Sequence, residues 1–115
     1  MNLDNMSIAE IWTLIDTTLN GNPEPIQGMN TTYSLNLSGD DGGSFGLIFK
    51  DGKAETLSGE IADADCALTM SVKDFKKLLA GKLNSTGAFM MGKLKVKGNI
   101  GLALKLESLL KQYQF

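Results

Sequence analysis

Gly81–Gly98 reads Gly-Lys-Leu-Asn-Ser-Thr-Gly-Ala-Phe-Met-Met-Gly-Lys-Leu-Lys-Val-Lys-Gly, and the rest of the chain is organised around this stretch. Its first half contains the apolar run Phe89–Met91, which we expect on a short helix capped by Ser85 and ended by Gly92. Methionine is flexible and fills irregular apolar space. In the second half, Lys93–Lys97, lysines alternate with apolar residues. This period of two predicts a strand with one apolar and one basic face.

The same stretch and the residues before it form a pattern of glycines and apolar residues at fixed offsets. Its members are Asp74, Phe75, Leu78, Leu79, Gly81, Lys82, Leu83, Ala88, Phe89, Met90, Gly92, Lys93, Leu94, Val96 and Gly98. With this pattern the chain resembles the sterol carrier protein-2 family, and the resemblance extends more loosely over nearly the whole sequence. It implies a domain that holds one lipid, such as a sterol, fatty acid, acyl-CoA or phospholipid, in an apolar tunnel.

Length and composition indicate one globular domain. A chain of 115 residues has room for one core, so we expect residues 1–115 to form a single lipid-binding domain. No apolar run approaches the ~18 residues that a membrane span needs. The sequence starts without a secretory signal pattern and ends without a peroxisomal address, and Cys66 is its one cysteine. A single cysteine suits a reducing compartment, so we expect a cytoplasmic location.

The absence of histidine and arginine limits the chemistry that the chain can perform. Without histidine, the common general base and zinc ligand are missing. We therefore predict no catalytic residue, no metal site, no cofactor and no enzymatic activity; a hydrolase acting through Asp or Ser residues ranks last. Cys66 alternates with apolar positions and is expected to be a buried small hydrophobe. Without arginine, any anionic head group must be bound by lysines or backbone N–H groups.

Charge is distributed unevenly along the chain. Through Met70, two lysines oppose eleven acidic residues, a net charge of −9; from Ser71 onward, nine lysines oppose two acidic residues, a net charge of +7. Few aromatic residues and no arginine accompany these lysines, so nucleic-acid binding is not expected. Three lysines share the basic face of the predicted strand and are assigned to lipid head groups or an anionic membrane surface: Lys93, Lys95 and Lys97. A simply solvated face remains the alternative.

Three helices are predicted besides the short one. The first is expected to begin at a capping box formed by Ser7 and Glu10 and to end at Gly21. Its buried stripe consists of Ile8, Ile11, Trp12, Ile15 and Leu19. The second is expected to be capped by Ser71, and the last by Asn99. The last helix is apolar around an unusually wide arc, which requires a second partner beyond an ordinary two-layer contact.

Alternating residues predict the strands and hence the fold class. Strands are expected over residues 32–37, 44–50, 53–58 and 66–70, and in the Lys-rich segment described above. The Asp51–Gly52 pair is expected to form a tight turn. The element order α-β-β-β-β-α-β-α predicts an α+β domain whose five-stranded, mostly antiparallel sheet is covered on one face by helices. The resemblance implies the same architecture.

The predicted pocket lies between the sheet and the helices. Half of its wall comes from residues that match the family pattern, and the other half comes from the helical phase of the last helix. These residues are Phe75, Leu79, Phe89, Met90, Leu102, Leu106, Leu109 and Leu110. The predicted function is that of a carrier for a fatty acyl chain, acyl-CoA, sterol or phospholipid. The alternative is a non-catalytic homodimerisation or docking module of a lipid-metabolising enzyme, and the sequence leaves monomer and homodimer open.

Overall fold

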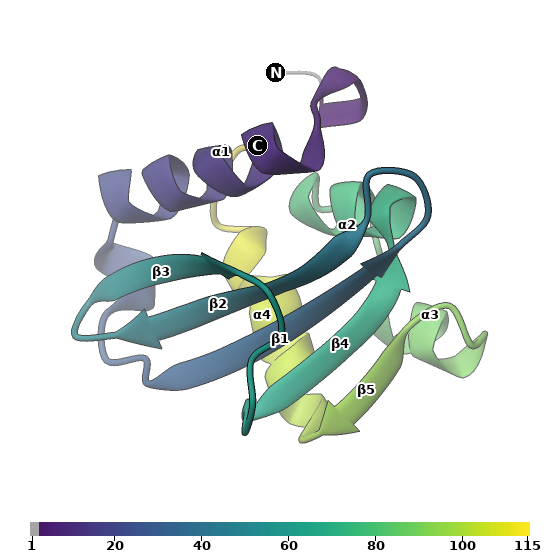
Figure 1. Cartoon of the computed structure of the whole chain (residues 1–115). Helices are drawn as coiled ribbons and strands as arrows, with labels where there is room; N and C mark the ends of the chain where they lie inside the picture. Colours follow the sequence, from purple (N-terminus) through teal and green to yellow (C-terminus); the bar gives the residue numbers. More distant parts are fainter. Residues whose placement is uncertain (1–2) are drawn as a thin grey trace.

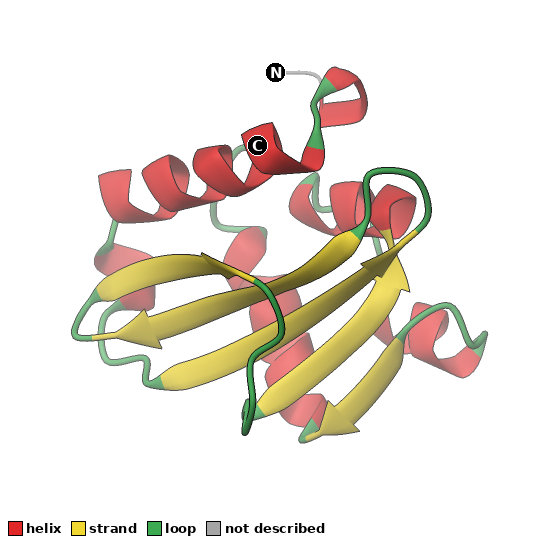
Figure 2. Cartoon of the chain, in the orientation of Figure 1, coloured by secondary structure: helices red, strands yellow, loops and turns green. Residues whose placement is uncertain are grey.

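Helices lie on one side of a five-stranded sheet in the computed structural model, which describes residues 3–115 (Figure 1). The helical elements are η1 (Leu3–Asn5), α1 (Ile8–Gly21), η2 (Glu24–Ile26), α2 (Val72–Leu79), α3 (Ser85–Met90) and α4 (Ile100–Leu110). The strands are β1 (Thr31–Ser38), β2 (Gly43–Lys50), β3 (Lys53–Ser58), β4 (Cys66–Ser71) and β5 (Lys95–Gly98). Figure 2 shows the two layers as yellow strands and red helices. The predicted α+β fold class is confirmed.

The strands lie in the order β3-β2-β1-β4-β5, so β1 is central. Neighbouring strands are antiparallel except for β1 and β4, which are parallel. A two-residue turn joins β2 to β3, and its central residues Asp51 and Gly52 have φ values of 54° and 73°. Positive φ at both positions is the conformation that a tight hairpin with the natural strand twist requires. The sheet is therefore mostly antiparallel, as predicted.

The first helix begins as its sequence indicates. The Ser7 hydroxyl accepts a hydrogen bond from the Glu10 N–H at 3.2 Å, and the Glu10 carboxylate accepts one from the Ser7 N–H at 2.9 Å. The carboxylate of Asp41, on the β1–β2 loop, accepts a further hydrogen bond from the Ile8 N–H at 2.6 Å. Free N–H groups at a helix start need acceptors, so these three bonds fix where α1 begins. All five residues of the predicted stripe are buried.

Besides one-residue differences at the ends of β1, β2 and β4, two boundaries differ from the sequence prediction. Asn84, not Ser85, caps α3, because its side-chain oxygen accepts from the Gly87 N–H at 3.0 Å and Ser85 is the first helical residue. The last strand starts at Lys95 instead of Lys93. The N–H groups of Lys93 and Leu94 donate to the Ala88 carbonyl, at 2.9 and 3.1 Å, and are therefore part of the turn that ends α3.

The core lies between the inner face of the sheet and the helices. Its strand residues alternate along the chain, and the largest of them, Tyr33 and Phe49, meet edge to face at 5.9 Å. The Tyr33 hydroxyl donates to the Leu102 carbonyl at 2.7 Å and ties α4 to the central strand. On the outer face, the segment from residue 59 to 65 crosses in front of β2 (Figure 1). A Cβ at Gly46 would overlap the Ile61 side chain, so glycine permits this crossing.

Candidate functional site

Most of the predicted pocket wall converges in one buried cluster between the layers. Phe75 and Leu79 of α2 and Leu106, Leu109 and Leu110 of α4 all belong to this hydrophobic core, and the two helices contact each other. Each of these side chains is at most 3% exposed. In this conformation they are packed core residues, and the two helices supply them as their apolar spacing predicts. Their role as the wall of a lipid pocket stays a prediction.

The other three predicted wall residues, Phe89, Met90 and Leu102, are less buried than this cluster. Phe89 and Met90 on α3 are 42% and 80% exposed. The short helix turns Ser85 and Ala88 inward instead. Leu102 is half-buried and packs against the edge of the core. The structure thus divides the predicted wall into five buried residues, the half-buried Leu102 on α4, and two exposed residues on α3.

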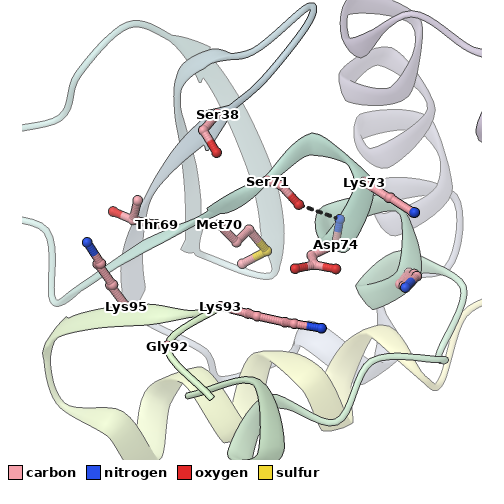
Figure 3. A pocket seen from close by; sticks show the side chains of 10 residues that line it. Ser38, Thr69, Met70, Ser71, Lys73, Asp74, Gly92, Lys93 and Lys95 are labelled. Carbon is pink, nitrogen blue, oxygen red and sulfur yellow. Dashed lines mark hydrogen bonds between the residues drawn. The ribbon is translucent and has the colours of Figure 1, made fainter. Parts of the chain in front are cut away.

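A groove opens where β4 passes into α2, and the segment between α3 and β5 forms its other side (Figure 3). Its volume is about 590 Å³. The residues that line it are Ser38, Thr69, Met70, Ser71, Lys73, Asp74, Lys77, Gly92, Lys93 and Lys95. Lys93 and Lys95 were predicted to contact head groups, and both line this groove, which we call the lysine groove. Lys97 lies further along β5, opposite Ala67, and lines a different hollow.

Local sequence explains how the lysine groove forms. Lys73 and Lys77 are four residues apart on α2, so they share one exposed helix face. On β4, Thr69 and Ser71 alternate with the inward-facing Met70. The register of the antiparallel pair places Lys95 directly opposite Thr69.

The lysines of the groove form no ion pair with a described acidic residue, although Asp4 shares a neighbouring hollow with Lys73 and Lys77. Within residues 3–115, none of the four forms an ion pair or a hydrogen bond; the ion pair that the structure shows there joins Lys111 to Glu107 at 3.0 Å. The neighbouring Lys76 is different, because its ammonium donates to the carbonyls of Asp4 and Met6 at 3.4 and 3.2 Å. Asp74 is the one acidic residue in the lining, so four positive charges face one negative charge. Such a concave surface attracts anions.

Met70 connects the lysine groove to the core. Its side chain is 3% exposed and belongs to the same buried cluster as Phe75 and Leu79. It also lines the groove, and Figure 3 shows its thioether next to the Asp74 carboxylate, with the Lys93 side chain below. Methionine adapts its shape easily because it is unbranched and has rotatable bonds up to the sulfur. A cationic surface and an apolar interior therefore meet at one adaptable side chain.

Cys66, the cysteine of the chain, lies in the interior. Cys66 is fully buried, and burial, together with the negative charge of Asp65, raises the pKa of its thiol. A protonated, inaccessible thiol is a poor nucleophile. Across residues 3–115, no cluster of His, Cys, Asp or Glu side chains has the arrangement of a metal site. In the same residues, no helix combines the length and hydropathy that crossing a bilayer requires.

Sequence reasoning missed part of the groove. It gave no functional role to Lys73, Lys77, Ser38 or Thr69, and it expected Ser71 only as the cap of the second helix. The four-residue spacing of the two lysines was a usable signal, since it places both on one face. Their position beside Lys93 and Lys95 depends on the pairing of β4 with β5, for which the sequence offered no direct signal.

Comparison with known proteins places the chain in a family. The family model described as the SCP-2 sterol transfer family matches residues 13–111. Hydroxysteroid dehydrogenase-like protein 2 of Mus musculus is 40% identical over 107 residues, which are 92% of this chain and 21% of that protein. The chain thus spans about a fifth of the length of this curated relative.

Two solved structures agree in fold. Sterol carrier protein 2 from Yarrowia lipolytica, in its apo form, superimposes with a TM-score of 0.74 at 35% identity, over 90% of this chain and 89% of that one. The sterol carrier protein domain 2 of Helicoverpa armigera gives a TM-score of 0.75 at 28% identity, over 97% and 91% of the two chains. Since the family model covers most of the sequence and the yeast protein is similar along nearly its whole length, this chain belongs to the SCP-2 sterol transfer family.

Proposed function

We propose that this domain binds one lipid molecule and holds its apolar part between the sheet and the helices. The observation that carries the proposal is the convergence of Phe75 and Leu79 with the leucines of α4 in one apolar layer. The names of the structural relatives, sterol carrier proteins, support a sterol or another long apolar ligand. A fatty acid, an acyl-CoA and a phospholipid also have a long apolar chain that needs an apolar binding site.

Burial of an acyl chain provides enough free energy for useful affinity. A dozen methylenes at ~0.8 kcal/mol each give about 10 kcal/mol before the costs of association and ordering are subtracted. Because the wall residues are packed together in this conformation, side chains must move apart to admit the ligand, and this movement costs further free energy. We therefore expect an affinity in the roughly micromolar range.

The domain acts in this proposal as a non-catalytic lipid-binding module in the cytoplasm. The mouse relative is named as dehydrogenase-like, and the chain matches about a fifth of it. In a longer protein of that kind, we propose that the domain supplies or receives the lipid on which a separate catalytic part acts. The buried, protonated Cys66 supports a binding role rather than thiol chemistry.

Native mass spectrometry of protein purified without detergent, followed by displacement with a fluorescent fatty acid and a fluorescent sterol, tests the proposal. We expect one lipid per chain and displaceable binding of at least one of the two probes. Leu110→Ala should weaken this binding. Ile26→Ala is the matched control, because Ile26 is equally buried, at 1% exposure, and lies outside the predicted wall. Absence of displaceable binding, or equal affinities of the two variants, contradicts a lipid pocket at this place.

A docking module is the second candidate function, and exposed apolar side chains favour it. On α4, Ile100 and Leu104 are 43% and 40% exposed, and Met90 and Met91 near the end of α3 are more exposed still. The widened apolar arc of the last helix therefore turns partly to solvent. Light scattering coupled to gel filtration distinguishes the cases: a homodimer that Leu104→Ser dissociates supports this function, and a monomer at high concentration contradicts homodimerisation.

A further inference from the structure

We propose that the lysine groove binds the phosphate group of a lipid whose apolar chain lies between the sheet and the helices. The inference rests on the proposed function and narrows it, because it selects phosphate-bearing lipids over uncharged ones. It concerns Lys73, Lys77, Lys93 and Lys95, two of which had no assigned role.

The charge of the groove is the first argument. Four lysine side chains line it, Asp74 is the one carboxylate in its lining, and none of the four lysines forms an ion pair or a hydrogen bond with another described residue. The sequence adds to this, since no acidic residue occurs between Asp74 and Glu107. A phosphate monoester carries close to two negative charges at neutral pH, and lysine binds it as a point charge without needing a fixed orientation.

Hydrogen-bond donors are the second argument. The hydroxyls of Ser38, Thr69 and Ser71 line the same groove as the lysines. The Ser71 oxygen accepts a hydrogen bond from the Asp74 N–H at 3.0 Å, which leaves its own O–H able to donate (Figure 3). Phosphate oxygens only accept hydrogen bonds when ionised, so hydroxyls and ammonium groups together match them.

The connection to the core is the third argument. Met70 lines the groove and also belongs to the buried cluster that contains Phe75 and Leu79. An amphiphile with its phosphate among the lysines would pass its chain into the apolar layer when Met70, which is 3% exposed in this conformation, moves aside. An uncharged sterol would use the apolar layer alone. The groove volume of about 590 Å³ also leaves room for a head group larger than phosphate itself.

Two lipids that differ in one group test the inference directly. A lysophosphatidate and the monoacylglycerol with the same acyl chain are titrated into the full chain below their critical micelle concentrations, by calorimetry at low salt. We expect lysophosphatidate to bind at least about tenfold more tightly, because several ammonium groups contribute about 1 kcal/mol each near an anionic head group. The difference should shrink as salt screens the charges.

Two double variants test whether the preference for lysophosphatidate arises in the lysine groove. Lys73→Gln combined with Lys93→Gln should weaken lysophosphatidate binding by about tenfold and leave monoacylglycerol binding unchanged. Lys50→Gln combined with Lys53→Gln is the matched control, since it removes the same charge from exposed lysines at the β2–β3 turn. Exposed lysines tolerate such changes with little loss of stability, so both variants should fold.

The outcomes separate this inference from the proposed function. Equal binding of both lipids, or equal effects of both lysine pairs, overturns the phosphate site and leaves lipid binding intact. Failure of every lipid to bind overturns both proposals. Inorganic pyrophosphate serves as a third ligand: if it binds as tightly as lysophosphatidate, the groove recognises free phosphate and the connection to the apolar layer is wrong.

Discussion

The Glu107 carboxylate accepts a hydrogen bond from the Ser85 N–H at 2.6 Å, and so α4 holds the first residue of α3. The other carboxylate oxygen pairs with Lys111 at 3.0 Å. Burial alone would raise the pKa of Glu107, but its hydrogen bonds with Ser85 and its contact with Lys111 outweigh burial and lower it.

Replacing Glu107 by Gln should therefore cost about 1 kcal/mol of unfolding free energy at neutral pH, because the amide oxygen can still accept from the Ser85 N–H but the contribution of the negative charge is lost. A lowered folded-state pKa stabilises the protein above the unfolded value, near 4.5, and this stabilisation is lost as pH falls through the folded pKa. Denaturant titrations of wild type and variant should consequently converge in acid. If the difference in unfolding free energy between wild type and variant is constant over pH, this role of Glu107 is contradicted. An equal difference for Glu55→Gln, at an exposed position, contradicts it as well.

Trp12 should report lipid entry. It is the one tryptophan of the sequence, it is 6% exposed, and it stacks between Phe45 and Phe75 with centroid distances of 5.0 and 5.4 Å. A lipid that displaces Phe75 must change the surroundings of the indole. We expect a shift or quenching of tryptophan emission that saturates at one lipid per chain. If the emission is unchanged although mass spectrometry shows a bound lipid, the prediction that Phe75 belongs to the pocket wall is wrong.

Membrane contact is predicted for the end of α3 and for the lysine that lies outside the groove. Met90 and Met91 are 80% and 70% exposed, and Lys97 is exposed on β5. Met91→Ser combined with Lys97→Gln should lower partitioning onto phosphatidylserine-containing vesicles several-fold, since each surface lysine contributes about 1 kcal/mol. Vesicle sedimentation measures this, and lipid affinity in solution is the control that should stay constant. Equal sedimentation of wild type and variant speaks against a membrane role.

Cys66 should react with a thiol reagent only when the protein opens. Its side chain is fully buried, and burial raises the pKa of the thiol, so little reactive thiolate forms in the native state. We expect the modification rate by Ellman's reagent to rise with denaturant in parallel with unfolding. Rapid modification in buffer alone would show that β4 is accessible in the native state.

Elements whose signals are local could be predicted from the sequence. The capping box of Ser7 and Glu10 and the caps provided by Ser71 and Asn99 all form as expected. The strand from Lys53 to Ser58 has the predicted bounds. In each case the deciding interactions lie within a few residues, so the sequence contains the whole signal.

Features that depend on distant residues could not be predicted in the same way. Asn84 caps α3, and at the same helix start the Ser85 N–H donates to Glu107, a residue of the distant helix α4. Phe89 matched the family pattern, yet it lies 42% exposed because Ala88 takes the inward position on a helix of six residues. The lysine groove likewise requires the pairing of β4 with β5. Such outcomes follow from tertiary packing, which overrides local preference.

The parallel pairing of β1 with β4 has a consequence for how the chain acquires its structure. Until residues 66–71 have been synthesised, β1 has one edge without a partner, and its apolar face lacks α2 and α4. The Thr32 N–H donates to the Asp65 carboxylate at 2.8 Å and the Asp65 N–H to the Thr32 carbonyl at 2.9 Å, so the connecting segment locks onto β1 only at that stage. An unpaired strand edge invites association with other chains. The first 58 residues alone should therefore aggregate, and a chain cleaved between residues 59 and 64 should regain its structure when the two fragments are refolded together.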